Sequence, residues 1–398
     1  MGILFVTWNF PPRRGGIENL MGHLVAGLKV RHSVVVITAH AANAASGGEH
    51  GIYRAPLPGL IPFAFYAIWR GALSLIRDPE IEAVFGGSAM VTPLVFLLAR
   101  LFRRKAIVQA HGLDLVYQSI FYQLLCVRWL RYCDRAVANS GHTALLAAER
   151  GVSRESISVI PLGVDTAQFA PAANGERLKK ESGLEGRRVI LFVGRLARRK
   201  GVKEFIQHCL AAVVRAVPKA CFVVAGGNPT QSLAHRDDVL SEIRAAVREL
   251  GLQDHARIVG EVNDDELVKF YQCCDVVVLP ALASGEDVEG FGLVLLEAAA
   301  AGKPAVATRV GGIPDAVAGG ESGILTEPGD YRELSRSVIE LLVDDERRLR
   351  MGGFARQRAQ KEFSWETIVA RYEAILGRQP VTADPAGQVK SSHARRTS

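Results

Sequence analysis

The sequence is poor in the residues that stabilise small or extracellular folds. Only six of its 398 residues are cysteine, and none stands in a CxxC pair or near a histidine at metal-ligand spacing. We therefore expect buried free thiols in a reducing compartment rather than disulfides or a zinc site. The 39 glycines show no repeat and 48% of the residues are hydrophobic, which excludes a collagen-like or disordered chain.

Strong net charge is also missing. The chain has 48 Lys and Arg against 41 Asp and Glu, a formal charge of +7, which is too small for a dedicated nucleic-acid binder. The excess is uneven, because residues 1–166 carry 16 basic and 10 acidic side chains, and the last 21 residues carry 4 and 1. Two halves of different charge predict two domains with different ligands.

No N-terminal signal and no bilayer-length apolar run is apparent. The chain opens on strand-like residues, and a loop rich in proline and glycine follows at residues 11–16. The longest strongly apolar stretches, such as residues 90–99, are shorter than the roughly 20 residues that span a bilayer. We expect a cytoplasmic protein, or one that is peripheral on the inner face of the membrane.

What the sequence does have is an alternation of short Val- and Ile-rich runs with segments of helical period. This alternation is typical of βα units that form parallel sheets. In the first half we expect strands at residues 2–7, 33–38, 83–86, 106–110, 135–139 and 156–160. We expect helices there at residues 17–29, 90–102, 117–132 and 142–150.

A polar segment, residues 166–187, interrupts the pattern and predicts a linker with one short helix. The strands expected after it are residues 188–193, 220–225, 256–259, 276–279, 304–308 and 323–326. The helices expected after it are residues 203–216, 238–250, 264–272, 292–301, 331–342 and 345–363. The predicted fold class is α/β, with two Rossmann-like, doubly wound parallel-sheet domains, residues 1–166 and 182–363, facing across a cleft. We expect residues 378–398 to be a disordered tail.

Several catalytic motifs are absent. The first turn has no GxGxxG, and the near match at residues 290–295 has Leu where the third glycine is required, which argues against a dehydrogenase. The chain also lacks a P-loop, HExxH, GxSxG and a DxD motif that could hold a metal between phosphates. Glycine-rich turns at the predicted strand ends remain, where doubly wound sheets bind ligands.

One of these turns carries two cations, Arg195 and Lys200, in a strand-to-helix loop. Their spacing suits a pyrophosphate clamp, since Arg binds bidentately and Lys supplies a compact charge. The alternative is a solvated basic loop, because Arg198 and Arg199 are adjacent.

Two carboxylates, Glu289 and Glu297, flank a glycine-rich segment at the start of an Ala-rich helix. If the helix begins near Gly292, the backbone amides of Phe291, Gly292 and Leu293 point into the space between the carboxylates. Such an arrangement can bind two sets of hydroxyls and a phosphate or sugar oxygen. The alternative for Glu297 is a salt-bridged or surface side chain.

Together these motifs resemble the retaining glycosyltransferases of family four, which have the GT-B fold. The resemblance rests on Pro11-Pro12 with Gly15-Gly16, His111-Gly-Leu-Asp114, Pro161-Leu-Gly-Val-Asp165, Gly194-Arg195 with Lys200-Gly201, Glu289 with Glu297, Gly311-Gly312-Ile-Pro-Asp315 and Phe363-Ser-Trp365. It covers residues 1 to about 377. Residues 10–17 and 285–292 look closest to the GDP-mannose-dependent mannosyltransferases that act on phosphatidylinositol lipids.

The resemblance implies a role for each matching residue in donor binding. Arg195 and Lys200 would hold the donor diphosphate, Glu297 the ribose hydroxyls, and Glu289 the hydroxyls of the transferred sugar near its anomeric carbon. The amides around Phe291, Gly292 and Leu293 would contact sugar or phosphate.

The resemblance also implies contacts from the first domain and the base side. Gly16 would let the first loop close on the β-phosphate, and His111 would line the sugar subsite. Val262 would pack near the nucleotide base. The C-terminal helix, residues 364–377, would pack back on the first domain.

The implied activity is that of a retaining hexosyltransferase of the EC 2.4.1 type in polysaccharide or glycolipid biosynthesis. It would move mannose or glucose from a nucleotide-diphosphate sugar, GDP-mannose before a UDP-sugar, to a lipid-linked or glycan hydroxyl. No metal and no cofactor are expected. Retention by same-face attack is favoured over a double displacement through Glu289. The alternatives are a sugar-nucleotide 2-epimerase and a catalytically silent sugar-nucleotide-binding partner subunit.

The basic excess of the first domain is interleaved with aromatic residues. The basic residues are Arg70, Arg77, Arg100, Arg103, Arg104, Lys105, Arg128 and Arg131, and the aromatic residues are Phe63, Phe65, Trp69, Phe96, Phe102, Phe121 and Trp129. This composition predicts a surface that docks on anionic lipid headgroups. A solvated basic face over ordinary core aromatics is the alternative.

Overall fold

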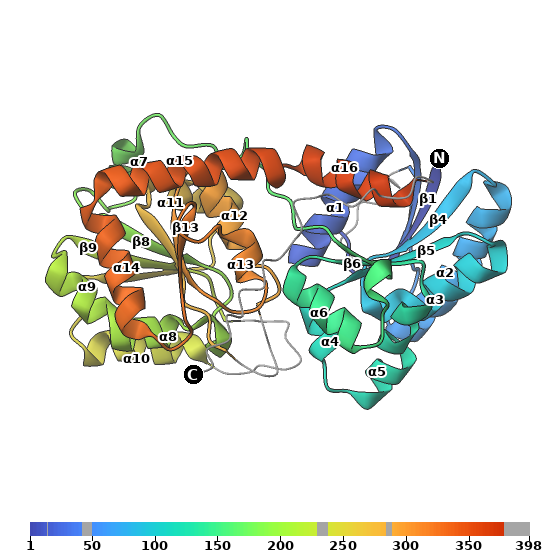
Figure 1. Cartoon of the computed structure of the whole chain (residues 1–398), viewed down its shortest axis with the longest axis horizontal. Helices are drawn as coiled ribbons and strands as arrows, with labels where there is room; N and C mark the ends of the chain where they lie inside the picture. Colours follow the sequence, from blue (N-terminus) through green and yellow to red (C-terminus); the bar gives the residue numbers. More distant parts are fainter. Residues whose placement is uncertain (14, 42–49, 229–237, 284–288, 378–398) are drawn as a thin grey trace, which may run out of the picture.

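Two α/β domains lie side by side, each with helices on both faces of a parallel sheet (Figure 1). This computed structural model describes residues 1–13, 15–41, 50–228, 238–283 and 289–377. The predicted fold class, two doubly wound parallel sheets, is confirmed. The predicted disordered tail, residues 378–398, lies outside the described residues.

The first domain contains a seven-stranded sheet in the order β3-β2-β1-β4-β5-β6-β7. Its strands are β1 (Gly2–Thr7), β2 (Ser33–Thr38), β3 (Ile52–Arg54), β4 (Ile81–Gly86), β5 (Lys105–Ala110), β6 (Arg135–Ala138) and β7 (Ile157–Val159). Six of them match predicted strands, whereas β3 was not predicted. It has three half-buried residues at the sheet edge, too few to show a hydrophobic pattern.

The helices of this domain cover both faces of the sheet. They are α1 (Gly16–Lys29), α2 (Leu60–Arg77), α3 (Thr92–Phe102), α4 (Gly112–Val116), α5 (Ile120–Leu125) and α6 (Gly141–Glu149), with the 3-10 helices η1 (Ala89–Val91), η2 (Val127–Tyr132) and η3 (Arg154–Ser156). The single helix predicted over residues 117–132 is wrong, because α5 ends before Cys126 and a 3-10 helix continues from Val127.

The alternation of side chains along β1 explains how this sheet is buried on both faces. Leu4 and Val6 join a core with α2 and α3, whereas Ile3 and Phe5 join a second core with α1. All six residues of β1 are buried. The carboxyl end of β1 is therefore held rigidly where the chain leaves the sheet toward the cleft.

The second domain contains a six-stranded parallel sheet in the order β10-β9-β8-β11-β12-β13. Its strands are β8 (Arg188–Val193), β9 (Ala220–Ala225), β10 (Ala256–Gly260), β11 (Val276–Leu279), β12 (Ala305–Thr308) and β13 (Gly323–Thr326). All six were predicted, because each is a short, mostly apolar run next to a glycine, proline or charged residue.

The helices after residue 166 include the short one predicted in the linker. They are α7 (Gly175–Glu181), η4 (Arg198–Lys200), α8 (Val202–Phe205), the π-helical turn η5 (Ile206–Leu210), α9 (Ala211–Ala216), α10 (Val239–Glu249), α11 (Asp264–Cys273), α12 (Leu293–Ala300), α13 (Ile313–Ala316), α14 (Tyr331–Val343), α15 (Asp345–Glu362) and α16 (Trp365–Leu376). The capping box of Asn263 and Glu266 fixes the start of α11.

The last two helices connect the domains, since α15 lies on the second domain and α16 lies against α1 of the first (Figure 1). Trp365 stacks on His23 of α1 with ring centroids 4.4 Å apart. The Tyr372 hydroxyl donates a 2.7 Å hydrogen bond to Gln109 in β5. The C-terminal helix thus contributes to the core of the first domain.

Helix α2 corrects two expectations from the sequence. It is the one helix in the described part of the chain that is long and apolar enough to cross a membrane, by length and composition alone. The sequence analysis did not predict it and treated residues 90–99 as the longest apolar stretch. Phe63 is fully buried in the core, whereas Phe65 and Trp69 on the same helix are 74% and 61% exposed.

Candidate functional site

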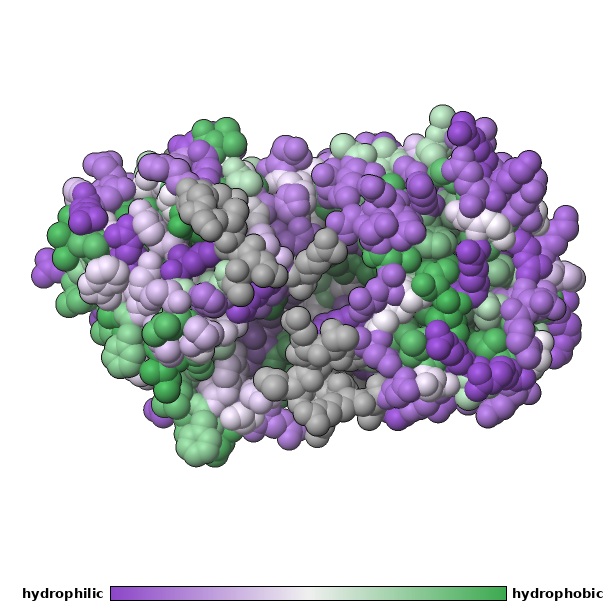
Figure 2. All heavy atoms as spheres, turned by 180° about the vertical axis from the view of Figure 1, so that it is seen from behind, coloured by the Kyte–Doolittle hydropathy of each residue, from purple (hydrophilic) through white to green (hydrophobic). Residues whose placement is uncertain are grey.

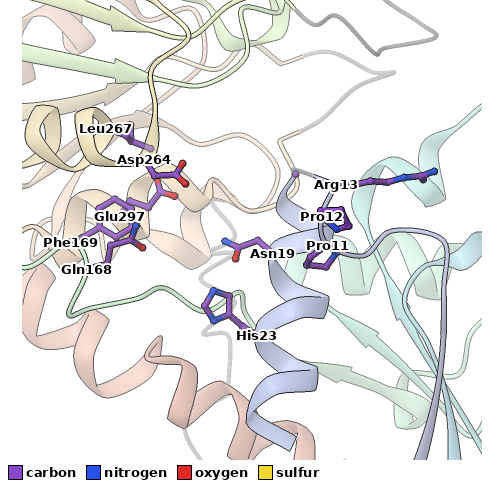
Figure 3. A pocket seen from close by; sticks show the side chains of 11 residues that line it. Pro11, Pro12, Arg13, Asn19, His23, Gln168, Phe169, Asp264, Leu267 and Glu297 are labelled. Atoms are coloured by element: carbon purple, nitrogen blue, oxygen red, sulfur yellow. The ribbon is translucent and has the colours of Figure 1, made fainter. Parts of the chain in front are cut away.

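The two domains meet around a cavity of about 470 Å³. It is lined by Pro11, Pro12, Arg13, Gly15, Asn19 and His23 on one side and Gln168, Phe169, Asp264, Leu267 and Glu297 on the other. In Figure 3, Glu297 and Asp264 lie opposite Asn19 and His23 of α1. A space-filling view from behind shows the hollow between the domains (Figure 2). Parallel sheets bind ligands at the carboxyl ends of their strands, and the cavity is bordered by loops that leave those ends.

Glu297 lies in the second turn of α12 and lines this cavity. Its Oε2 accepts a 2.6 Å hydrogen bond from the hydroxyl of Tyr271 in α11, which also lies 3.2 Å from the carbonyl of Val294. Burial raises the pKa of Glu297, and the Tyr271 hydrogen bond partly opposes this rise. Glu297 is therefore an oriented hydrogen-bonding group and neither of the two alternatives, a salt-bridged or a surface side chain.

Glu289 is held by two cations. Lys200 Nζ and Arg199 Nη1 both lie 2.6 Å from Glu289 Oε2, and all three side chains are about nine-tenths buried. Burial alone would raise the pKa of Glu289, but Lys200 and Arg199 lower it to about 2. Burial lowers the pKa of Lys200, and Glu289 opposes that change. Glu289 is thus a permanent carboxylate at neutral pH.

The other cations of this loop differ in environment. Arg195 is exposed, and within the described ranges its guanidinium has no hydrogen-bond or ion-pair partner. Arg198 also points to solvent but pairs with Glu242 of α10. The loop is therefore only in part the solvated basic loop of the alternative interpretation. Arg199 was not among the predicted site residues, because adjacency in sequence does not show which of the basic residues at η4 turn inward.

The helix that carries Glu297 begins where the sequence predicted. Gly292 has φ of 84°, a left-handed conformation that favours glycine, and α12 begins at the next residue, Leu293. Phe291 is buried. The amide of Gly312 donates to the Glu289 carbonyl at 2.9 Å, which fixes the loop before the helix.

The first loop enters the site from the other domain. Gly16 begins α1, and a side chain at this position would meet no atom within 4 Å, so its surroundings are open. A side chain at Gly15 would instead collide with Glu18, whose carboxylate accepts a 2.7 Å hydrogen bond from Asn9. The start of α1 is thus accessible to a ligand, and the Asn9–Glu18 contact supports the loop beside it.

His111 directly follows β5 and is buried. Its Nε2 lies 3.1 Å from the carbonyl oxygen of Gly87 at the end of β4. A carbonyl only accepts, so Nε2 carries the proton and Nδ1 of the neutral imidazole is an acceptor. The hydrogen bond to Gly87 gives His111 a structural role, and it leaves Nδ1 for a ligand hydroxyl.

Three glycines let the domains touch beside these residues. A Cβ on Gly112 would lie 3.6 Å from the Cα of Gly290, and one on Gly312 would lie 2.8 Å from the Cβ of Ser140 in the first domain. The backbone N–H of Gly141 in α6 donates to Asp315 Oδ2 at 3.1 Å across the domain boundary. The contact brings His111 of the first domain near Glu289 of the second.

The structure thus divides the predicted site residues into neighbouring groups. Glu289 and Lys200 are in direct contact, and Glu297 lines the cavity that Gly15 and Asp264 also line. Val262 is half-buried two residues before Asp264 and packs on the core of the second domain. Tyr271 escaped the sequence analysis, because nothing in the sequence distinguishes its hydroxyl from that of any other buried tyrosine.

Metal ligands do not gather in this region. No group of three or more His, Cys, Asp or Glu side chains that could hold a metal ion occurs in the described part of the chain. The six cysteines are free, and all but Cys126 are buried.

Two family models together match most of the chain. The model described as Glycosyltransferase Family 4 matches residues 14–168, and the model described as Glycosyl transferases group 1 matches residues 174–358. The first covers six of the seven strands of the first domain, all but β1, and the second covers all six strands of the second domain.

Curated relatives align along nearly the whole length. The GDP-mannose-dependent alpha-(1-6)-phosphatidylinositol monomannoside mannosyltransferase of Mycobacterium tuberculosis (strain H37Rv) is 29% identical over 389 residues, which cover 94% of this chain and 97% of the relative. The corresponding enzyme for the monoacylated acceptor in Corynebacterium glutamicum is 28% identical over 388 residues, which cover 95% of this chain and 98% of the relative.

Solved structures share the fold. The Anabaena protein HepE in complex with UDP superimposes with a TM-score of 0.78 at 21% identity, covering 94% of this chain and 99% of that chain. Sucrose-phosphate synthase from Thermosynechococcus elongatus gives a TM-score of 0.75 at 22% identity, covering 94% and 98%. The overall arrangement of two facing domains is therefore that of these proteins.

Proposed function

The chain belongs to the family 4 glycosyltransferases and has the GT-B fold, and from this we propose that it transfers a hexose from a nucleotide-diphosphate sugar to a hydroxyl acceptor. GDP-mannose is the favoured donor, ahead of UDP-glucose or another UDP-sugar. The reason is that the two relatives described above, which align along nearly the whole chain, are GDP-mannose-dependent enzymes. The acceptor is a lipid-linked or glycan hydroxyl.

One observation carries this proposal, the buried contact of Lys200 and Arg199 with Glu289 beside the start of α12. Three cations, with Arg195 included, and one carboxylate leave two positive charges in this loop. A nucleoside diphosphate sugar carries two negative charges on its phosphates, so the loop and the ligand are complementary. Glu289 keeps the buried cations paired until the donor arrives.

The same charges favour the reaction itself. Cleavage of the anomeric C–O bond builds positive charge on the sugar and negative charge on the departing diphosphate. Lys200 and Arg195 would stabilise the developing phosphate charge, and ionised Glu289 would stabilise the positive sugar carbon or bind its neighbouring hydroxyls. These protein charges would serve in place of a metal ion.

Retention of configuration by same-face attack agrees with the state of Glu289. A double displacement would require this carboxylate to attack the anomeric carbon. Its Oε2 already accepts hydrogen bonds from two cations, which lower its nucleophilicity. In the same-face route the leaving phosphate oxygen takes the acceptor proton, and Glu289 forms no covalent bond to the sugar.

Thermal unfolding with GDP, UDP, ADP and their sugars tests the donor. A ligand at 100 times its dissociation constant stabilises a protein by about 2.7 kcal/mol. We expect GDP-mannose to raise the melting temperature most. No shift with any of the nucleotides would contradict the proposal. Release of GDP that depends on an acceptor then separates transfer from 2-epimerisation and from silent binding.

An exposed apolar face suggests how a lipid-linked acceptor is reached. It comprises side chains on α2, α3 and α5 that are each about half exposed or more: Ile61, Phe65, Trp69, Ile76, Leu97, Leu101, Ile120, Phe121, Leu124 and Leu125. Arg77, Arg100, Arg128 and Arg131 are exposed in or beside the same helices. Figure 2 shows apolar side chains along the outer and lower edges of the first domain, on the left of that view. We infer that this apolar face docks on anionic lipid.

Vesicle sedimentation tests the docking face. We expect binding to vesicles with anionic phospholipid at low salt, and we expect the double substitution Phe65→Ser, Trp69→Ser to reduce it by about tenfold or more. The matched control is Val343→Ser with Leu349→Ser, which removes two equally exposed side chains from α14 and α15 of the second domain. Equal binding by both double variants would contradict the assignment of this face.

A further inference from the structure

Two side chains at the cleft edge of the first sheet carry buried polar atoms without partners. Ser88 follows β4 and Asn139 follows β6, and they are 3% and 5% exposed. Within the described residues, neither Ser88 Oγ nor Asn139 Oδ1 has a hydrogen-bond partner. An unsatisfied buried polar group costs about 1–3 kcal/mol, so each requires an explanation.

Both residues lie beside His111, which directly follows the strand between them. The sheet order places β5 between β4 and β6, and Ala110 pairs with Ala138 in register. His111 and Asn139 are the next residues along these two strands. His111 Nε2 also contacts the carbonyl of Gly87, the residue before Ser88. Three consecutive strand ends therefore present polar side chains, each more than nine-tenths buried.

Asn139 also faces the second domain. A Cβ on Gly290 would lie 3.6 Å from Asn139 Nδ2, and Gly290 directly follows Glu289. The amide of Asn139 is thus buried by the segment that carries the paired carboxylate. An unpartnered acceptor in this place lies where both domains border the reacting ligand.

A purely structural role does not explain these atoms. Gln109, inside β5, also has an unpartnered Nε2, but its Oε1 accepts the Tyr372 hydroxyl and joins α16 to the sheet. Within the described structure, Asn139 Oδ1 and Ser88 Oγ form no hydrogen bond that would connect two elements of the fold. Acceptor oxygens that lack a hydrogen-bond partner at a ligand-binding edge can accept a hydrogen bond from an O–H group of the ligand.

We propose that Asn139 and Ser88 bind sugar hydroxyls on either side of His111 and so help to select the hexose. This proposal rests on the proposed function, because it takes the ligand to be the sugar substrates of a glycosyl transfer. A hexose ring presents several hydroxyls, each of which can donate to Asn139 Oδ1, Ser88 Oγ or His111 Nδ1. The hydroxyls belong to the transferred sugar or to the acceptor, and the two sources are separated by experiment.

The test measures transfer with deoxy analogues. For wild type, Asn139→Ala and Ser88→Ala, kcat and KM are measured with GDP-mannose and with GDP-mannose lacking one hydroxyl at a time. If the site reads a hydroxyl of the donor sugar, Asn139→Ala lowers kcat/KM about 10- to 100-fold with the full donor. In wild type, one particular deoxy donor should have a lower kcat/KM than the full donor, and in Asn139→Ala this difference, the deoxy penalty, should disappear. If the altered penalty appears with deoxy acceptors instead, the hydroxyls belong to the acceptor.

Three further measurements distinguish the loss of a sugar contact from a general loss of folded structure. GDP affinity stays near the wild-type value in both variants, because the residues proposed to hold the diphosphate, Arg195 and Lys200, belong to the second domain. The melting temperature of Asn139→Ala does not fall below that of Ser74→Ala, a control that removes a buried hydroxyl hydrogen-bonded to Arg70 within α2. Asn139→Asp, which keeps the acceptor oxygen, retains more activity than Asn139→Ala.

The outcomes are distinct from those that test the proposed function. Wild type that binds no nucleotide sugar and transfers no sugar overturns the proposed function. Wild type that transfers sugar, together with an Asn139→Ala variant that keeps full kcat/KM and the same deoxy penalties for donor and acceptor, overturns only the sugar-hydroxyl assignment.

Discussion

Glu289 owes its charge to two contacts that the linear sequence separates by about ninety positions. Both cations donate to the same oxygen at 2.6 Å, so the carboxylate is ionised although it is almost fully buried. Burial favours the neutral form, and the two adjacent charges outweigh it, which holds the pKa of Glu289 at about 2. This depressed pKa makes the stability of the second domain depend on pH.

Acid unfolding follows from this pKa. The folded-state pKa of about 2 lies below the ordinary value of 4.5, so the contribution of Glu289 to stability is present above about pH 4.5 and is lost as the pH falls toward 2. We expect Glu289→Gln to lower the free energy of unfolding at pH 6 and to make less difference at pH 3. Urea titrations at both pH values measure this, and a difference that does not change with pH would contradict it.

The sequence identified the residue types at the site but not their contacts. Arg195, Lys200 and Glu289 were predicted from their loops, and the contact of Lys200 with Glu289 follows the expected strand-end geometry. Arg199 could not be distinguished from Arg198, because the turn of η4 decides which guanidinium points inward. The orphaned oxygens of Ser88 and Asn139 depend on three-dimensional burial and have no sequence signal.

Helices α11 and α12 form one unit through Tyr271. Its ring packs edge-on against Phe169, with centroids 5.4 Å apart, and its hydroxyl contacts Val294 and Glu297 of α12. Burial raises the pKa of this hydroxyl well above its ordinary value, so it stays a donor at all physiological pH values. Tyr271 therefore determines where the Glu297 carboxylate lies in the cavity.

Removal of one hydroxyl tests this unit. Tyr271→Phe leaves the ring in place but leaves half-buried Glu297 without its donor, which costs about 1 kcal/mol of stability. We expect the KM for the donor to rise more than kcat falls. The control Tyr372→Phe removes a buried hydroxyl bonded to Gln109, and neither of these residues lines the cavity. It should lower stability and leave KM unchanged, and an equal KM for both variants would argue against the role of Tyr271.

The sequence predicted helices and strands correctly where a hydrophobic period was flanked by residues that commonly end such elements. Strands β1, β2, β8, β9, β11 and β13 have their predicted bounds. Helix α2 was missed although its buried residues Phe63, Ala67, Gly71, Ser74 and Leu75 recur at helical spacing, because apolar side chains on its exposed face obscure that pattern in the sequence. Its exposed side chains form part of the proposed docking face. The helix that was missed is therefore one whose exposed face is proposed to contact lipid.

The two domains are joined by a hydrogen bond as well as by the chain itself. Gly141 of α6 donates to Asp315, and Arg358 of α15 donates to the carbonyls of Asp315 and Ala316. Burial raises the pKa of Asp315, and the Gly141 N–H and Arg358 partly oppose the rise. Asp315 thus links the start of α6 to the helix that returns to the first domain. No sequence pattern predicted this contact, because it depends on how the domains are placed.

Loss of the Asp315 carboxylate should loosen the domains. We expect Asp315→Ala to increase the radius of gyration in small-angle scattering and to lower kcat by up to about 10²-fold, since misplaced catalytic groups have that cost. GDP affinity should change little. The control Asp330→Ala removes a carboxylate that caps α14 inside the second domain. The same scattering curve and the same turnover for both variants would show that the Gly141–Asp315 contact does not position the domains.

Acceptor-dependent release of GDP from saturating GDP-mannose tests the central claim most directly. Wild type should release GDP only when a lipid-linked or glycan acceptor is present. Lys200→Ala and Arg195→Ala should each be about 10²–10³-fold slower. The controls Lys203→Ala and Arg198→Ala remove neighbouring cations that pair with Glu242 at the surface, and both should stay near the wild-type rate. Near wild-type turnover by both Lys200→Ala and Arg195→Ala would contradict the account.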